Sequence, residues 1–176
     1  MAGRLILETD RLLLREFDED DAEAFCPLIS NPEIIRFTLD PGGGVNSVEQ
    51  ALEMLRSRSM ADYRKYGFGR LAVVEKASSQ LIGFAGLKHL EDRDEVDLGY
   101  RLLPTHWGRG FATESGRAIL HDGFTRLGLS RIIATVFPEN VASVRVLKKL
   151  GFVFEKPFES MGQELCQYVI NAGRST

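Results

Sequence analysis

The residues best suited to chemistry lie in the segment Trp107-Gly108-Arg109-Gly110-Phe111-Ala112, which follows an apolar stretch and precedes a segment with helical periodicity. Glycine tolerates positive φ and lets a ligand approach the backbone closely. The first N–H groups of a helix lack intrahelical acceptors and lie at its positive end, so a turn of this kind can bind a pyrophosphate. Arg109 would add a positive charge. From these residues alone, an ordinary glycine-containing connection is an equally good interpretation.

This segment matches neither of two common nucleotide-binding motifs. A P-loop requires Lys-Ser or Lys-Thr after its second glycine, and neither pair follows Gly110. The dinucleotide-binding motif needs a third glycine and an acidic residue at the end of the next strand, which the sequence also lacks. The turn therefore belongs to neither of these two motifs.

A second group of polar residues opens the helix expected at residues 140–150. Asn140 can cap this helix or present its amide to a ligand. Arg145, Lys148 and Lys149 can form a solvated face or meet a negatively charged ligand. The apolar residues of the same segment, Leu147 among them, are expected in the core.

Alternating apolar and polar residues and turn signals predict the elements that position these segments. Ser47-Val48-Glu49-Gln50 is a capping box, so a long helix should follow and end before Gly67. Helices are expected over residues 18–29, from 31, and over 47–65, 112–127 and 140–150. Strands are expected over residues 9–17, 71–74, 81–87, 96–103, 131–137, 152–158 and 163–170, with a loop at 41–44.

This order of elements predicts the fold class. Early helices, an antiparallel meander and then two strand–helix units indicate an α/β (α+β) protein with a mixed central sheet. A chain of 176 residues is long enough for one core without disulfide or metal staples. We therefore expect a single domain spanning residues 1–176.

Composition excludes several classes of function. The net charge of −3 and the pI near 5.7 argue against nucleic acid as the main partner. Cys26 and Cys166 lack the spacing of a zinc site or a disulfide framework, and the three histidines lack metal-ligand spacing, so no metal is expected. The apolar run near the N-terminus is too short for a signal peptide or a membrane span. We expect a cytoplasmic protein that does not bind membranes.

Taken together and in order, these motifs resemble the GNAT superfamily of N-acetyltransferases, in its RimJ/RimL branch. The resemblance extends over most of the chain. It is carried by the segments at residues 9–15, 20–22, 31–33, 82–83, 98–100, 107–114 and 140–152. It implies the GNAT fold: a mostly antiparallel sheet with helices on both faces and a splayed strand pair that binds acetyl-CoA.

The resemblance also implies which residues bind acetyl-CoA, the acetyl donor. Its pantetheine arm would pair with the backbone of Tyr100, Arg101 and Leu102. Its pyrophosphate would accept hydrogen bonds from the turn. The implied contacts in the turn are Trp107, Gly108, Arg109, Gly110, Phe111, Ala112 and Thr113, and further along the chain Asn140 and Ser143. Relatives usually have Gln or Arg where this chain has Trp107, which suggests that backbone amides hold the phosphates and that the indole packs beneath the turn.

The implied reaction is direct attack of an amine on the thioester, for which positioning supplies much of the rate. Many relatives protonate the leaving thiolate with a tyrosine where this chain has Leu147. Ser143 resembles the serine suggested for this role in the RimL type, although it can equally be a helix-end residue. Asp97 and Glu95 are the candidate bases, and either could instead be a salt-bridged carboxylate.

The acceptor is the least defined part of the prediction. A protein or peptide N-terminal α-amine is the leading interpretation, and a small-molecule amine such as an amino acid, polyamine or antibiotic is the alternative. A non-catalytic acyl-CoA-binding module is a third hypothesis, because Leu147 replaces the usual acid. The acidic stretches at residues 18–21 and 91–95 could attract a cationic acceptor. A monomer or a homodimer is expected.

Overall fold

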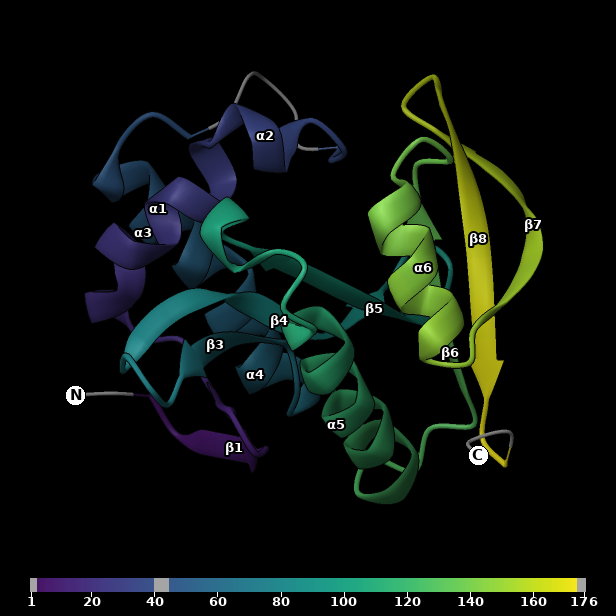
Figure 1. Cartoon of the computed structure of the whole chain (residues 1–176), viewed down its shortest axis with the longest axis horizontal. Coiled ribbons are helices and arrows are strands. Elements are labelled where there is room, and N and C mark those ends of the chain that lie inside the picture. Colours follow the sequence, from purple (N-terminus) through teal and green to yellow (C-terminus); the bar gives the residue numbers. More distant parts are fainter. Residues whose placement is uncertain (1–2, 40–44, 174–176) are drawn as a thin grey trace.

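The structure is a computed structural model that describes residues 3–39 and 45–173, so the loop expected at 41–44 lies outside the described residues. One sheet of eight strands runs through these residues in the order β1-β2-β3-β4-β5-β6-β8-β7 (Figure 1). The strands are β1 (Leu5–Glu8), β2 (Leu12–Arg15), β3 (Arg70–Glu75), β4 (Gln80–Leu90), β5 (Glu95–Leu102), β6 (Arg131–Val136), β7 (Val153–Ser160) and β8 (Gln163–Asn171). Within the described residues, only the pairing of β5 with β6 is parallel.

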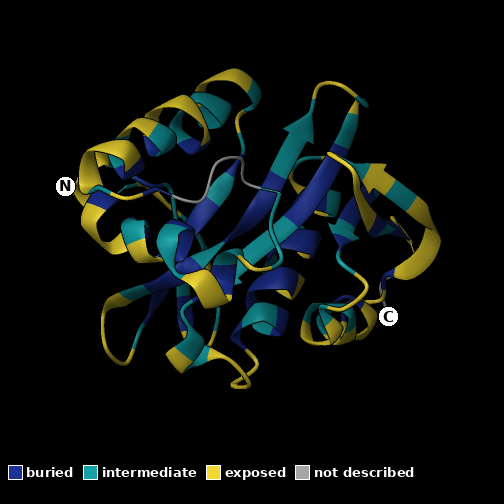
Figure 2. Ribbon diagram, turned by 90° about the horizontal axis from the view of Figure 1, so that it is seen from above, coloured by how far each residue is buried: buried dark blue, intermediate teal, exposed yellow. Residues whose placement is uncertain are grey.

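Helices cover both faces of this sheet. They are α1 (Ala22–Ser30), α2 (Pro32–Ile35), α3 (Val48–Ser57), α4 (Ser59–Tyr66), α5 (Phe111–Thr125) and α6 (Val141–Lys149), with short 3-10 turns at Glu19–Asp21 and Pro104–His106. Buried residues are concentrated in the strands and on the inner sides of the helices, as Figure 2 shows. The predicted mixed α/β architecture with helices on both faces is confirmed.

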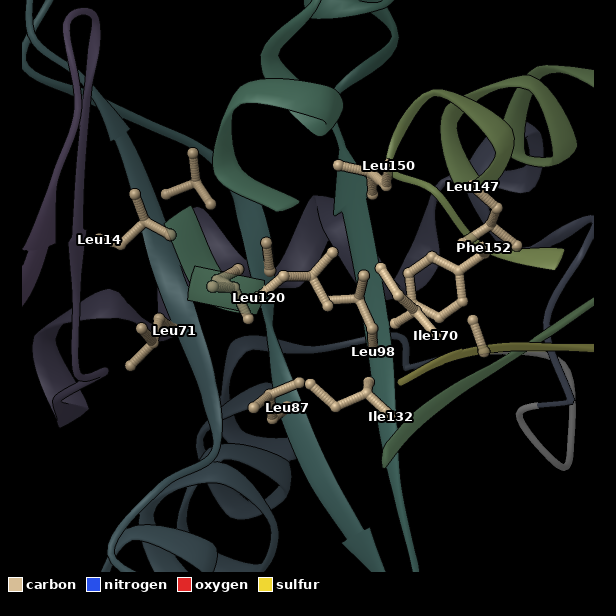
Figure 3. Close-up of a cluster of buried hydrophobic side chains, with 14 of the residues drawn as sticks. Leu14, Leu71, Leu87, Leu98, Leu120, Ile132, Leu147, Leu150, Phe152 and Ile170 are labelled. Atoms are coloured by element: carbon tan, nitrogen blue, oxygen red, sulfur yellow. The ribbon is translucent and has the colours of Figure 1, made fainter. Parts of the chain in front are cut away.

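The alternation of side chains along the strands divides the core in two. Leu71 and Val73 of β3 belong to the cluster that packs beneath α5 and α6, whereas Ala72 belongs to the cluster beneath α1 and α3. In Figure 3, Leu98 of β5 lies near Leu120 of α5. Burying one such leucine stabilises the fold by about 1.5–3 kcal/mol. The core thus fixes α5 and α6 on the same face of the sheet.

Two of the predicted elements differ from the structure. The strand expected over residues 9–17 is shorter, β2 at Leu12–Arg15, and an unpredicted strand, β1, precedes it; the N–H of Thr9 donates to the carbonyl of Leu12 at 3.0 Å and closes a tight turn between the two. The helix expected over 47–65 is broken at Arg58, where φ is −113° and ψ is −89°. The break lets α3 pack on α1 while α4 packs on β4, which one straight helix could not do.

Strands β5 and β6 form the predicted splayed pair. They are paired in register at one position, Asp97 with Ile133. On its other side β6 pairs with β8 along its whole length, from Arg131 to Val136. Beyond Asp97 the backbone of β5 that faces β6 therefore has no strand partner within the described residues. This opening separates the end of β5 from α6.

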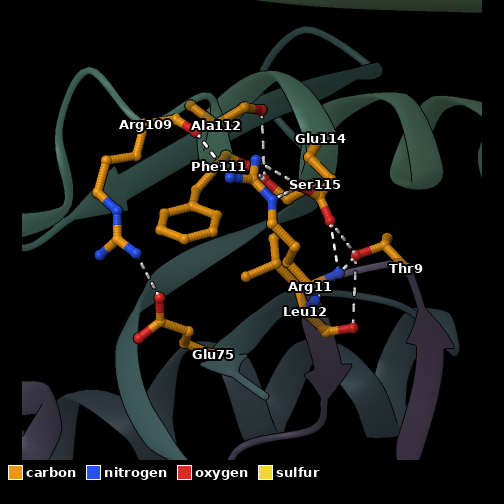
Figure 4. Close-up of polar contacts among 9 residues, drawn as sticks. All are labelled: Thr9, Arg11, Leu12, Glu75, Arg109, Phe111, Ala112, Glu114 and Ser115. Carbon is orange, nitrogen blue, oxygen red and sulfur yellow. Dashed lines mark hydrogen bonds and ion pairs between the residues drawn. The ribbon is translucent and has the colours of Figure 1, made fainter. Parts of the chain in front are cut away.

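A carboxylate holds the start of α5 to the turn between β1 and β2 (Figure 4). Glu114 accepts hydrogen bonds from the Thr9 hydroxyl at 2.6 Å, the Arg11 backbone N–H at 2.9 Å and the Arg11 Nε at 2.7 Å. These hydrogen bonds and the Arg11 guanidinium hold the pKa of Glu114 below its usual value, although burial opposes them. Arg11 also donates to the carbonyl of Arg109 at 3.0 Å, so the contact extends to the turn before α5.

Replacing Glu114 with alanine should destabilise the protein by about 1–3 kcal/mol, because the half-buried Thr9 hydroxyl and the two Arg11 donors lose their acceptor. The folded-state pKa is lowered, so this stabilisation is present above the unfolded pKa and is lost as pH falls through the folded value. Urea unfolding of wild type and variant from pH 7 down to pH 3 measures this. The difference in unfolding free energy should shrink below about pH 4.5.

Asp122→Ala on the same helix is the matched control, since Asp122 holds Arg126 in an i,i+4 pair. It should cost less than about 1 kcal/mol. Equal losses for the two variants would contradict the role given to Glu114.

Candidate functional site

A groove of about 990 Å³ crosses the molecule where β5 and β6 diverge. One part of its wall comes from α1, α2 and α3 together with β3, β4 and the odd-numbered residues of β5. The other part comes from the turn before α5, from the end of β6 and from α6. Because the diverging strands leave an opening in the sheet, the groove reaches both of its faces.

The turn before α5 has the geometry of an anion site. Gly108 has a φ of +71° and Gly110 a φ of +83°, values that favour glycine. The backbone N–H groups of Gly108, Arg109 and Gly110 find no acceptor among residues 3–39 and 45–173. The first N–H groups of α5, a helix of 15 residues, follow directly and lie at its positive end. The exposed turn can therefore receive negatively charged oxygens.

The side chains of this turn are arranged differently from what was expected. Trp107 is 47% exposed, and its indole N–H donates to the carbonyl of Leu102 at 2.8 Å. The expectation that it packs beneath the turn is wrong, because the hydrogen bond holds the ring at the end of β5. Arg109 is paired with Glu75 at 2.8 Å and lies over the ring of Phe111. Its positive charge is thus fixed beside the turn.

The ring of Phe111 packs against the side chains of Arg11 and Arg109. Its ring is buried, with the guanidinium carbon of Arg11 4.4 Å and that of Arg109 4.7 Å from the ring centroid. Figure 4 shows the ring between the two side chains. Glu75 completes the arrangement, and hydrogen bonding from Ser78, together with the Arg109 charge, holds the pKa of Glu75 below its usual value although burial opposes them. The guanidinium groups of Arg11 and Arg109 are therefore held in fixed positions beside the turn before α5.

Across the opening, Tyr100 of β5 contacts Ser143 of α6. The two hydroxyl oxygens are 2.7 Å apart, and the Tyr100 hydroxyl also donates to the Ser143 carbonyl at 3.3 Å. Burial raises the pKa of Tyr100 to about 12, so the phenol keeps its proton at neutral pH. Asn140 caps α6 by accepting from the backbone N–H of Ser143 at 3.2 Å, and both residues line the groove.

Asp97 lies where β5 and β6 begin to diverge and also lines the groove. It is 8% exposed, and its carboxylate accepts from Arg70 at 2.5 Å. Burial raises the pKa of Asp97, and the Arg70 guanidinium opposes this shift. A side chain at Gly99 would collide with that guanidinium, so glycine at this position lets Arg70 cross the strand to reach Asp97.

Glu95 and the two acidic stretches lie elsewhere. Glu95 pairs with Arg131 at 3.1 Å and does not line the groove. Asp21 pairs with Arg15, and Glu91 pairs with Lys65. The described acidic residues that line the groove are Glu33 and Asp97. The structure thus brings Asp97 and Ser143 to one groove and leaves Glu95 outside it.

Arg70 and the side chain of Tyr100 are site residues that were not predicted. Arg70 could have been signalled by Gly86 and Gly99, because glycines in strand interiors often mark close approach of another group. The described ranges 3–39 and 45–173 contain no group of acidic, histidine or cysteine side chains that could hold a metal ion. They also contain no helix long and apolar enough to cross a membrane.

Comparisons with known proteins agree with this geometry. Residues 11–153 match the model of the acetyltransferase (GNAT) domain family. The chain is 40% identical over 149 residues to the uncharacterized N-acetyltransferase YoaA of Bacillus subtilis (strain 168), covering 84% of this chain and 82% of that protein. A solved GNAT-family acetyltransferase from Bacillus anthracis superposes with a TM-score of 0.78 at 25% identity and covers 94% of this chain and 97% of its own.

A second solved structure is similar in fold alone. It is RimL, described as a ribosomal L7/L12 alpha-N-protein acetyltransferase in complex with coenzyme A. It superposes with a TM-score of 0.80 at 20% identity, covering 96% of this chain and 98% of that one. Together with the family match, the splayed sheet and the anion-binding turn, these similarities show that the chain belongs to the GNAT family of acetyltransferases.

Proposed function

We propose that this protein is a single N-acetyltransferase domain, spanning residues 1–176, that transfers the acetyl group of acetyl-CoA to a primary amine. The observation that carries the proposal is the groove itself. It connects the exposed N–H groups before α5 with a buried carboxylate, Asp97, through the opening between β5 and β6. A donor and an acceptor that enter from opposite faces of the sheet would meet at this opening.

The residues of the groove fit acetyl-CoA as the donor. The pyrophosphate would accept hydrogen bonds from the backbone of residues 108–113. The free edge of β5 at Tyr100, Arg101 and Leu102 would pair with the amides of the pantetheine arm, as an added strand does. Arg145 and Lys149 of α6 also line the groove and would meet the remaining negative charge. Asn140 would border the donor while it caps α6.

The chemistry needs one proton acceptor and one proton donor. Asp97 would take a proton from the acceptor ammonium, and the free amine would then attack the thioester carbon. When the carbon–sulfur bond breaks, the nitrogen loses its second proton to solvent, and the leaving thiolate gains a proton from the Ser143 hydroxyl. The Ser143 hydroxyl recovers its proton from solvent. Glu95 has no part in this proposal, because it lies outside the groove.

The contact with Tyr100 supports Ser143 in this role. The Tyr100 hydroxyl is within hydrogen-bonding distance of both oxygens of Ser143, the Oγ at 2.7 Å and the carbonyl at 3.3 Å. In the arrangement we propose, the phenol donates its single hydrogen to the Ser143 Oγ, and the hydrogen of the serine hydroxyl remains available for the groove. Tyr100 is accordingly a positioning residue that orients the serine proton toward the sulfur.

The acceptor we favour is an α-amine. The solved structure of RimL, which shares this fold, belongs to an acetyltransferase described as acting on the α-amine of a ribosomal protein. A protein or peptide N-terminus and a small molecule with an α-amine present the same nucleophile. The groove continues past Asp97 to α1, α2 and α3, so the part beyond the reacting amine has space to bind.

Gly110→Glu should abolish binding of acetyl-CoA, because a carboxylate would occupy the space of the pyrophosphate and repel it. Gly110→Ala imposes a similar backbone strain at positive φ without the charge, at about 1–2 kcal/mol. Calorimetric titration with acetyl-CoA should show no heat of binding for the glutamate variant and retained binding for the alanine variant. Gly128→Glu, also at positive φ but outside the groove, should bind normally. Undiminished affinity in Gly110→Glu would rule out the anion site.

Ser143→Ala should lower kcat by about 10- to 100-fold, the effect of losing a hydrogen bond to a charged group, with the KM for acetyl-CoA nearly unchanged. Tyr100→Phe should lower kcat less, and the double variant should lose less than the product of the two effects because they share one function. Thiol release monitored with a disulfide reagent measures each rate.

Tyr168→Phe is the matched control, since Tyr168 is a buried tyrosine that does not line the groove. Its kcat should match that of wild type. An unchanged kcat in Ser143→Ala would leave the serine as part of the helix end.

A further inference from the structure

The part of the groove beyond Asp97 is positively charged, although the chain as a whole has a net charge of −3. This part, the acceptor end, is formed by α1–α3 and by β3, β4 and β5. The basic side chains that line it are Arg36, Arg58, Arg70, Lys88 and Arg101. The described acidic side chains there are Glu33 and Asp97, and Asp97 is held by Arg70. The local charge is thus opposite to the net charge of the chain.

Lys88 stands out among these cations. It is half-buried on β4 and lines the groove, yet its ammonium has no hydrogen bond or ion pair with any residue in the ranges 3–39 and 45–173. Asp62 of α4 is an opposing charge that Lys88 influences without pairing: burial raises the pKa of Asp62, and the Lys88 charge opposes the shift. A half-buried ammonium without a bound anion loses hydration without compensation. An anionic group of a ligand would supply the missing partner.

The strand register places Lys88 beside the proposed base. Lys88 and Asp97 are directly opposite each other in the antiparallel pair of β4 and β5, so both side chains lie on the same face. Cβ atoms of such pairs are about 5 Å apart. Adjacent positive and negative side chains are complementary to a molecule that carries an ammonium and a carboxylate on neighbouring atoms. The ammonium would face Asp97 while the carboxylate faces Lys88.

The acceptor end also has an apolar wall. Phe25 of α1 and Phe84 of β4 lie with their ring centroids 6.0 Å apart, and Ile29 and Met54 line the groove beside them. The guanidinium of Arg101 lies 5.4 Å from the centroid of the Phe84 ring, at the boundary between the charged and the apolar part. An acceptor with a compact apolar portion next to its charged groups would fit this combination.

We propose that the acceptor is an α-amine with a carboxylate close to it, and that Lys88 binds this carboxylate. The inference rests on the proposed acetyltransferase function and narrows its substrate class. Two kinds of molecule carry both groups: a free α-amino acid, and a peptide whose first residue is Asp or Glu. Polyamines are disfavoured, because their cationic chain would meet the basic residues of the acceptor end.

Pairs of acceptors that differ only in the carboxylate test the proposal. Free amino acids are compared with their carboxamides, and peptides beginning with Asp or Glu with those beginning with Asn or Gln. The kcat/KM for at least one carboxylate member should exceed that of its amide by about 10-fold or more, as expected for a charge-assisted hydrogen bond. A preference among the free amino acids identifies the acceptor as an amino acid, and a preference among the peptides identifies it as a peptide.

Variants of Lys88 connect the preference to the residue. Lys88→Met should lower kcat/KM for the carboxylate acceptor about 10-fold and leave its amide and the KM for acetyl-CoA unchanged, whereas Lys88→Arg should keep the preference. Lys156→Met is the matched control, because Lys156 is an exposed lysine on β7 outside the groove.

Three results would overturn the inference or part of it. If wild type acetylates acids and amides with equal kcat/KM, or prefers diamines, the acceptor does not need the carboxylate although the acetyltransferase function stands. If no amine of the panel supports thiol release while acetyl-CoA still binds, the proposed function fails and this inference fails with it. A preference that survives in a folded Lys88→Met protein would exclude Lys88 as the carboxylate-binding residue.

Discussion

Strands β5 and β6 are joined at Asp97 and Ile133 and diverge beyond that pair, and the candidate site depends on this divergence. A fully paired sheet would separate α5 and α6 from α1–α4 and leave two unconnected surfaces. The opening instead joins them in one groove. It also leaves backbone groups at the end of β5 available to a ligand. The core around Leu98 and Leu147 holds the elements on either side of the opening, so the gap is a fixed feature of the fold.

The two ends of the groove owe their properties to different interactions. At the end beside the turn before α5, where the acetyl donor is proposed to bind, glycines expose backbone N–H groups. The contact of Glu114 with Arg11 holds the start of α5 in place there. At the acceptor end, side chains supply the charge, and Gly99 lets Arg70 lie across β5 to reach Asp97. Backbone N–H donors are suited to the pyrophosphate of the proposed donor, acetyl-CoA, because this group is the same in every reaction cycle. Side-chain charges can differ between proteins of one fold, and in the proposed function that end would determine acceptor selectivity.

The sequence was sufficient to predict the mixed sheet, the order of its elements and the turn before α5, because periodicity and glycine placement are local signals. It did not predict the break at Arg58 or the strand β1 before Thr9, which depend on what the segments pack against. It placed Asp97 and Glu95 together as candidate bases, since both lie on one strand two residues apart. Only the tertiary arrangement shows that Glu95 is held by Arg131 outside the groove. The partnership of Tyr100 with Ser143 joins residues 43 positions apart and has no local signature.

The most direct test of this account is a crystal structure of the protein with CoA bound. The account predicts that the pyrophosphate accepts hydrogen bonds from the backbone N–H groups of residues 108–113. It also predicts that the pantetheine arm lies along Tyr100–Leu102 in the opening, with its sulfur within hydrogen-bonding reach of the Ser143 hydroxyl. CoA bound outside the opening between β5 and β6, or with its sulfur directed away from Ser143 and Asp97, would contradict it.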